Sequence, residues 1–239
     1  MLITFSLGVL SVFNLIERSR AFNMASNSIT IRGKTNKQQL DRDDCNYRFG
    51  VMTIDGSQLS ASVSYTLNNG QIMSQNSIHF VDNVLKFDAN TADEFVLSIN
   101  NADKIKIFCV YAPRGTRTEF SVSENNVNEF DALTNLQTIK LTNITLPSEF
   151  ITRNFALLKN LMNVDIIPGD DSVIGLESFK NLTNLKSLAL SGTENDHNMP
   201  HGNLSSLKDL KNLTELSLKS EFIYGNLSDL AEMSDLKIL

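Results

Sequence analysis

Apolar residues recur at a fixed spacing in the C-terminal part of the chain. A Leu-x-x-Leu-x-Leu pattern, with Val or Ile at some positions, begins at Leu136, Leu161, Leu185 and Leu213, and a further copy begins at Leu236. The spacings are 25, 24, 28 and 23 residues, as in proteins whose repeats bury their apolar faces against one another. Leucines two positions apart predict a short strand, and the apolar residues that step by three before it predict a helix or a 3-10 turn.

Two segments make the repeat more specific. They are Phe179-Lys-Asn-Leu-Thr-Asn-Leu185 and Leu210-Lys-Asn-Leu-Thr-Glu-Leu216, and they resemble bacterial variants of the leucine-rich repeat family. The resemblance covers residues 127–239. It implies an α/β solenoid, curved, with a parallel sheet on its concave side. In such a sheet Leu188, Leu190, Leu216 and Leu218 are expected to be buried in register.

The segment from residue 28 to residue 123 has a different pattern. Apolar residues alternate with polar ones at Tyr47, Phe49 and Val51 and again from Ile105 to Tyr111, and this period is typical of half-buried antiparallel strands. Asn69-Gly70 predicts a tight hairpin turn. We expect residues 47–54 to pair with 60–67, and 94–99 with 104–111, in a small β-sandwich.

These patterns predict three parts of the chain: an apolar segment 1–26, a β-sandwich-like domain 27–124, and repeats 127–239 that continue beyond the last residue. The apolar run Leu2–Ile16 lacks a preceding basic region. It is open to three interpretations: a signal-peptide core, a segment ahead of a true start at Met24, or an ordinary buried element. It is too short for a stable membrane span.

Charge and motifs limit the functions that remain. The net charge is −6 without a basic run, which argues against nucleic-acid binding. The sequence has no Gly-rich phosphate loop, no Cys-x-x-Cys and no His-Glu-x-x-His, so we expect neither an enzyme nor a cofactor. Cys45 and Cys109 could form one disulfide, or they could be a loop residue and a core residue.

Two polar loops follow the second and third repeat strands. Glu194, Asp196, His197 and His201 could gather a metal ion, but a polar surface insertion in the longest repeat is the favoured interpretation. Pro168-Gly-Asp170-Asp171 is interpreted as a turn rather than a weak calcium site.

The predicted binding surface consists of strand positions between the leucines, which the resemblance places on the concave side. These positions are Thr138, Lys140, Thr142, Asn163, Asp165, Ile167, Ser187, Ser191, Glu215, Ser217 and Lys219. Their small polar side chains suit a glycan or a polar protein surface, and they could also be merely solvated.

The sequence of these repeats is similar to that of repeat proteins from gut bacteria and their phages. We therefore expect a surface adhesin or receptor-binding module with an extracellular, cell-surface or virion location. The alternative is a structural or assembly component in which the repeats act as a spacer. Self-association is expected through the β-domain or through the last repeat.

Overall fold

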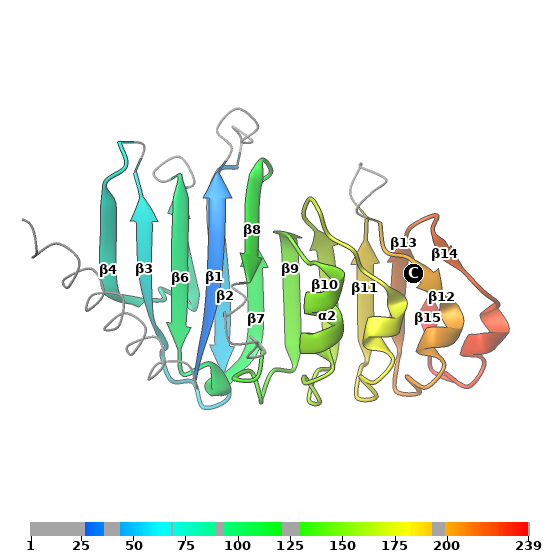
Figure 1. Ribbon diagram of the computed structural model, residues 1–239. Helices are drawn as coiled ribbons and strands as arrows, with labels where there is room; N and C mark the ends of the chain where they lie inside the picture. Colours follow the sequence, from blue (N-terminus) through cyan, green and yellow to red (C-terminus); the bar gives the residue numbers. More distant parts are fainter. Residues whose placement is uncertain are drawn as a thin grey trace, which may run out of the picture.

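The computed structural model describes residues 27–35, 44–67, 69–88, 93–120, 130–192 and 199–238. Its elements are mainly strands (Figure 1). The strands form sheets of five, eight and two strands. The predicted segment 1–26 and Leu239 lie outside the described residues.

The five-stranded sheet is antiparallel throughout. Its spatial order is β4 (Ile72–His79), β3 (Ser60–Thr66), β6 (Glu94–Asn100), β1 (Ser28–Thr35) and β8 (Thr116–Phe120). In the strands β1, β3 and β6, alternate side chains such as Ile31, Ala61 and Leu97 are buried. This alternation follows from the period of two in an extended strand, which turns successive side chains to opposite faces.

The eight-stranded sheet runs along the whole molecule. In spatial order it contains β5 (Val84–Asp88), β2 (Asn46–Thr53), β7 (Ile105–Tyr111), β9 (Thr138–Ile144), β10 (Asn163–Pro168), β11 (Ser187–Ser191), β13 (Glu215–Lys219) and β15 (Lys237–Ile238). The pairs β5–β2 and β2–β7 are antiparallel, and all pairs from β7 to β15 are parallel. The sheet therefore crosses the predicted domain boundary, because β7 pairs directly with β9.

The connections between the parallel strands contain short helical segments. The helix α2 (Ser148–Phe155) follows β9, and 3-10 turns follow the later strands: η3 (Leu176–Phe179), η5 (Leu204–Leu207) and η6 (Leu227–Leu230). Another 3-10 turn, η2 (Ala102–Lys104), precedes β7. The two-stranded parallel sheet consists of β12 (Gly202–Asn203) and β14 (Ile223–Tyr224).

One hydrophobic core lies under both large sheets. Between the two large sheets, the Tyr47 ring of β2 meets the Phe95 ring of β6 edge to face, with 4.7 Å between centroids. Farther along, Phe120 of β8 lies 5.3 Å from Phe150 of α2, and Phe155 of α2 lies 5.6 Å from Phe179 of η3. These aromatic contacts join the N-terminal strands to the repeat segment through side chains as well as through the sheet.

The strand leucines of the repeats lie in register. Leu188 of β11 is opposite Leu216 of β13, and Leu190 is opposite Leu218. Leu188, Leu190 and Leu216 are buried, whereas Leu218 is half-buried. The second and third leucines of the pattern therefore supply the inner face of a parallel sheet.

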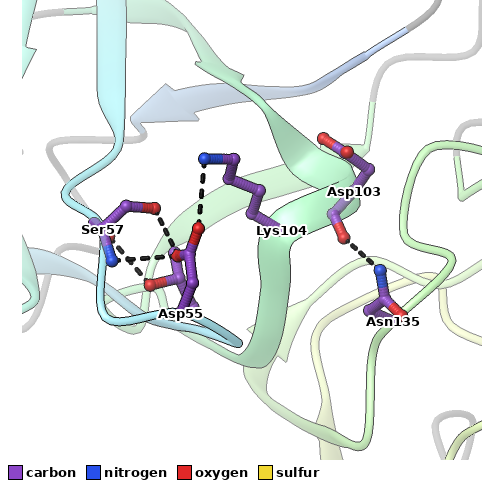
Figure 2. A network of polar contacts seen from close by, with 6 residues as sticks. Asp55, Ser57, Asp103, Lys104 and Asn135 are labelled. Atoms are coloured by element: carbon purple, nitrogen blue, oxygen red, sulfur yellow. Dashed lines mark hydrogen bonds and ion pairs between the residues drawn. The ribbon is translucent and has the colours of Figure 1, made fainter.

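An asparagine joins each of the first four repeats to the segment before it. The side-chain amides of Asn135, Asn160, Asn184 and Asn212 donate to the backbone carbonyls of Asp103, Thr134, Lys159 and Thr183, each at 2.8 Å. Every one of these residues directly precedes the first leucine of a repeat. Figure 2 shows the first of these bonds, from Asn135 to Asp103. We call these four residues the asparagine ladder.

The expected fold class, an α/β leucine-rich repeat solenoid after a small all-β sandwich-like domain, is wrong. The described residues form a β-rich fold of three sheets with a single α-helix of eight residues. Apolar residues that step by three produce four-residue 3-10 turns at η3, η5 and η6, because a 3-10 turn superposes residues three apart.

The strand pairings predicted for the N-terminal part are also wrong. β2 pairs with β5 and β7, and β3 pairs with β4 and β6, so the hairpins predicted from residues 47–67 and 94–111 do not form. Apart from β3 and β4, consecutive strands from β1 to β9 instead alternate between the two large sheets. The Asn69-Gly70 turn does join β3 to β4, with Gly70 at a φ of 78° and its N–H bonded to the Leu67 carbonyl at 2.8 Å.

The alternation predicted along β7 has the wrong phase, because most of the residues expected on the buried face lie on the other face. Ile105 is buried, but the next buried residues are Phe108 and Val110, while Ile107, Cys109 and Tyr111 are half-buried on the other face. The pairing with β2 shifts register between Met52 and Thr53, so that one extra β7 residue fits between Ile105 and Ile107. An irregularity of this kind moves later side chains to the opposite face.

Candidate functional site

One face of the eight-stranded sheet points away from the core. We use the name open face for the outward side chains of β2, β7, β9, β10, β11 and β13. Phe108 of β7 contacts Phe120 of β8, and Phe120 stacks on Phe150 of α2, so the second sheet and the helix both lie on the opposite side. All eleven predicted binding positions lie on the open face and are half-buried or exposed.

The strand register arranges the predicted residues in rows across the sheet. One row contains Thr138, Asn163, Ser187 and Glu215, and a second contains Lys140, Asp165, Ala189 and Ser217. Thr142 lies opposite Ile167, and Ser191 lies opposite Lys219. Neighbouring members of a row lie on adjacent strands, which are about 4.8 Å apart. The predicted residues therefore form one surface rather than scattered positions.

Two contacts tie the first two repeat strands together on the open face. The Asn163 amide donates to Thr138 Oγ1 at 3.1 Å, and Lys140 Nζ lies 2.6 Å from Asp165 Oδ2. The hydrogen bond to Asp165 raises the pKa of Lys140. Because both charged side chains are about half exposed, water screens the pair and it adds little stability. Its main effect is to remove net charge from the centre of the face.

The open face continues into the N-terminal part of the chain. Lys140 is opposite Cys109 of β7, which is opposite Gly50 of β2, and Thr138 is opposite Ile107, which is opposite Met52. Sequence reasoning missed this extension because it depends on the pairing of β7 with β9, which no local pattern encodes.

A charged cluster lies at one corner of the open face. Arg48 of β2 donates through Nη2 to both carboxylate oxygens of Asp44 at 2.7 Å, and its guanidinium lies 4.6 Å from the centroid of the Tyr111 ring. The bond from Arg48 lowers the pKa of Asp44, and burial raises the pKa of Tyr111. The planar guanidinium is thus held between a carboxylate and an aromatic ring, as is common for arginine.

The two cysteines are free thiols. Cys109 is opposite Gly50, and Cys45 lies five residues before Gly50 along an extended chain, which places the two about 16 Å apart. A disulfide requires Cα atoms within about 7 Å, so the two cannot pair within one chain. Burial raises the pKa of the Cys109 thiol, and a hydrogen bond with Asp88 raises that of Cys45.

The structure describes only part of the two polar loops. Glu194, Asp196 and His197 lie outside the described residues, and His201 forms a backbone bridge with Gly175. In the earlier loop, Asp171 has a φ of 60° and its carboxylate accepts from Arg117 Nη1 at 3.0 Å. Among the described residues, no three His, Cys, Asp or Glu side chains lie close enough to hold a metal ion.

A polar network lies where η2 meets the first repeat. Figure 2 shows Asp55 accepting from the backbone N–H of Ser57 at 3.0 Å, with Lys104 Nζ 3.2 Å from the other carboxylate oxygen. The bonds from Ser57, with a smaller effect of Lys104, lower the pKa of Asp55. These contacts fix a turn against η2, so we assign the network a structural role.

A shallow hollow of about 380 Å³ lies on the outer side of the five-stranded sheet. Its lining includes Lys34, Glu94, Arg117 and Glu119, which pair as Lys34–Glu94 at 3.2 Å and Arg117–Glu119 at 3.6 Å. The lining also includes Arg32, so it contains three cationic and two anionic side chains, four of which form these two pairs.

Comparisons with known proteins do not assign a family. A scan against protein-family models found no model that matches the chain, and a search of curated proteins found no match. Within the part of the chain that the structure describes, no helix is long and apolar enough to cross a membrane.

Proposed function

We propose that this protein is a non-enzymatic binding module whose open face holds a protein or glycan partner. The proposed setting is a cell surface or a virion, where the module acts as an adhesin or receptor-binding protein of a gut bacterium or its phage. The repeat resemblance to bacterial leucine-rich repeat proteins motivates this setting and remains a prediction.

One observation carries the proposal: the open face is a single surface from β2 to β13. Its repeat part carries small polar side chains, including Thr138, Ser187 and Ser217, and they lie in register. Such side chains hydrogen-bond a partner without long flexible groups that would have to be immobilised on binding. The partner that suits this face is therefore polar and elongated along the strand order.

The test inserts a large side chain at the centre of the open face. Ala189 lies between Asp165 and Ser217, and Ala189→Arg would cover both neighbouring strands. The probes are a printed oligosaccharide array and intact bacterial and epithelial cells, each with labelled protein. We expect the affinity for a bound probe to fall by at least about tenfold, because the contact surface is blocked.

The matched control is Ala231→Arg, which makes the same substitution at an exposed alanine beside η6 on the turn side. It should leave binding unchanged, and thermal unfolding should confirm that both variants fold. If a probe binds the wild type and Ala189→Arg equally well, but Ala231→Arg weakly, the open face is not the binding surface.

A further inference from the structure

The β3–β4 hairpin differs from the rest of the chain in its charge. Between Asp55 and Asp82, residues 56–81 contain no Lys, Arg, Asp or Glu, and this is the longest charge-free stretch in the sequence. Charged residues make up 20% of the chain, so a segment of this length would ordinarily carry about five. The stretch covers β3, its turn and β4 completely.

β4 is the outermost strand of the five-stranded sheet (Figure 1). It pairs with β3 on one side, and its residues are exposed on both faces, apart from the half-buried Ile78. Ile72 is 70% exposed and Met73 is 39% exposed. Edge strands are ordinarily protected by charged residues or proline, and β4 has neither. A bulge at the Ser77 end protects only the far part of the edge.

The register shows which backbone groups face outward. Leu67 donates to the Gln71 carbonyl at 2.8 Å, and Tyr65 lies opposite Met73. Bonded and non-bonded pairs alternate in an antiparallel ladder. Met73 and Gln75 therefore bond to β3, and the N–H and C=O groups of Ile72 and Ser74 point away from the sheet.

We propose that β4 is a self-association edge, at which a second copy of this chain adds its own β4 in antiparallel orientation. A two-fold axis at Met73 lets Ile72 of one copy exchange both hydrogen bonds with Ser74 of the other. The two five-stranded sheets then become one ten-stranded sheet. This contact covers part of the exposed surface of Ile72 and Met73 on both copies.

A second copy is the occupant that the charges favour. Each chain carries a net charge of −6, so two copies repel one another at most surfaces. An edge without charges is the place where this repulsion is smallest, and an antiparallel two-fold pairing makes such an edge complementary to itself. The other edge at this end of the molecule, β5, carries Lys86 and Asp88. This interface is separate from the open face and does not depend on the proposed function.

The test is the mass of the full chain in solution, measured by sedimentation equilibrium. We expect a dimer, with twice the 26.6 kDa mass of one chain. Ser74→Lys places a like charge on each strand beside the axis and should raise the dimer dissociation constant at least about tenfold. Ser74→Pro removes an outward N–H without breaking a bond to β3, and it should have the same effect.

The control is Ser62→Lys, which adds the same charge to the outer face of β3 and should remain dimeric. In a chain with Cys45→Ser and Cys109→Ser, Met73→Cys should form a disulfide-linked dimer, because residues at the axis lie about 4.5 Å apart. A monomeric wild type, a dimer that survives both Ser74 variants, or the absence of the Met73→Cys cross-link would overturn the proposal.

Discussion

At the scale of single residues, Tyr47 carries a buried hydroxyl into the aromatic cluster between the two large sheets. Its oxygen has no hydrogen-bond partner among the described residues, while its ring contacts Phe87 and Phe95. Burial of an unpaired hydroxyl costs about 1–3 kcal/mol. Tyr47→Phe should therefore leave the free energy of unfolding unchanged or raise it by up to about 2 kcal/mol, measured by urea denaturation.

The adjacent Phe49 supplies the control for Tyr47→Phe. Phe49→Ala removes a buried ring and should lower the free energy of unfolding by about 3–5 kcal/mol. A loss above about 1 kcal/mol in Tyr47→Phe would show that the hydroxyl is hydrogen-bonded in the folded protein.

The lowered pKa of Asp55 predicts that this residue contributes a pH-dependent part of the free energy of unfolding. Its pKa in the folded protein lies below the unperturbed 3.8, because Ser57 and Lys104 stabilise the carboxylate. A lowered pKa contributes stability that is present above the unfolded value and is lost as the pH falls toward the folded value. Wild type should thus be more stable than Asp55→Asn at neutral pH, and the difference should shrink as the pH falls below about 4.

Urea denaturation of both proteins at a series of pH values measures this difference. Its size is small, because the group is exposed to solvent. A difference that is constant from neutral pH to below the unperturbed pKa would mean that the charge on Asp55 does not stabilise the turn.

At the scale of elements, the asparagine ladder changes its chemistry in the last repeat. Asp235 stands where Asn184 and Asn212 stand in earlier repeats, directly before the first leucine, and a carboxylate cannot donate to a carbonyl. Asn184→Asp should lower the free energy of unfolding by about 1–2 kcal/mol, because it loses the bond to Lys159 and places two acceptors together. Asp235→Asn should slow amide exchange in residues 227–236.

Asn181→Asp is the matched control for the ladder. It makes the same change at an exposed residue of the same turn and should alter stability by less than about 0.5 kcal/mol. Equal losses from Asn184→Asp and Asn181→Asp would assign the effect to charge alone rather than to the ladder.

The elements also show what the sequence could and could not predict. Buried leucines such as Leu188 follow from their period, because burial of one strand face is a local property. The pairing of β2 with β7, rather than with β3, depends on contacts far apart in sequence. The phase error at Ile107 has the same origin, since the register shift opposite Met52 exists only in the paired strands.

At the scale of the whole molecule, the candidate site was predicted over its repeat half only. Periodicity located Lys140, Asp165 and Ser217 on one face without structural information. Arg48 and Tyr111 were missed, because they join that face only when β7 pairs with β9. A local pattern can identify a strand face, but the neighbours of a sheet are set by the global topology.

The shared sheet predicts that the whole chain unfolds in one step. β7 and β9 exchange backbone hydrogen bonds, and Phe120, Phe130 and Phe150 form a common core across the predicted boundary. Neither half can then unfold without exposing apolar surface of the other. Scanning calorimetry should show one transition, with equal calorimetric and van't Hoff enthalpies.

Two substitutions, one in each half, test the shared transition. Leu188→Ala in β11 should lower the free energy of unfolding by about 2–5 kcal/mol, and Phe49→Ala in β2 by about 3–5 kcal/mol. Because the halves share a sheet and a core, each substitution should shift the same single transition to lower temperature. Two separate transitions, of which Leu188→Ala moves only one, would show that residues 27–124 and 127–239 unfold as independent domains despite the continuous sheet.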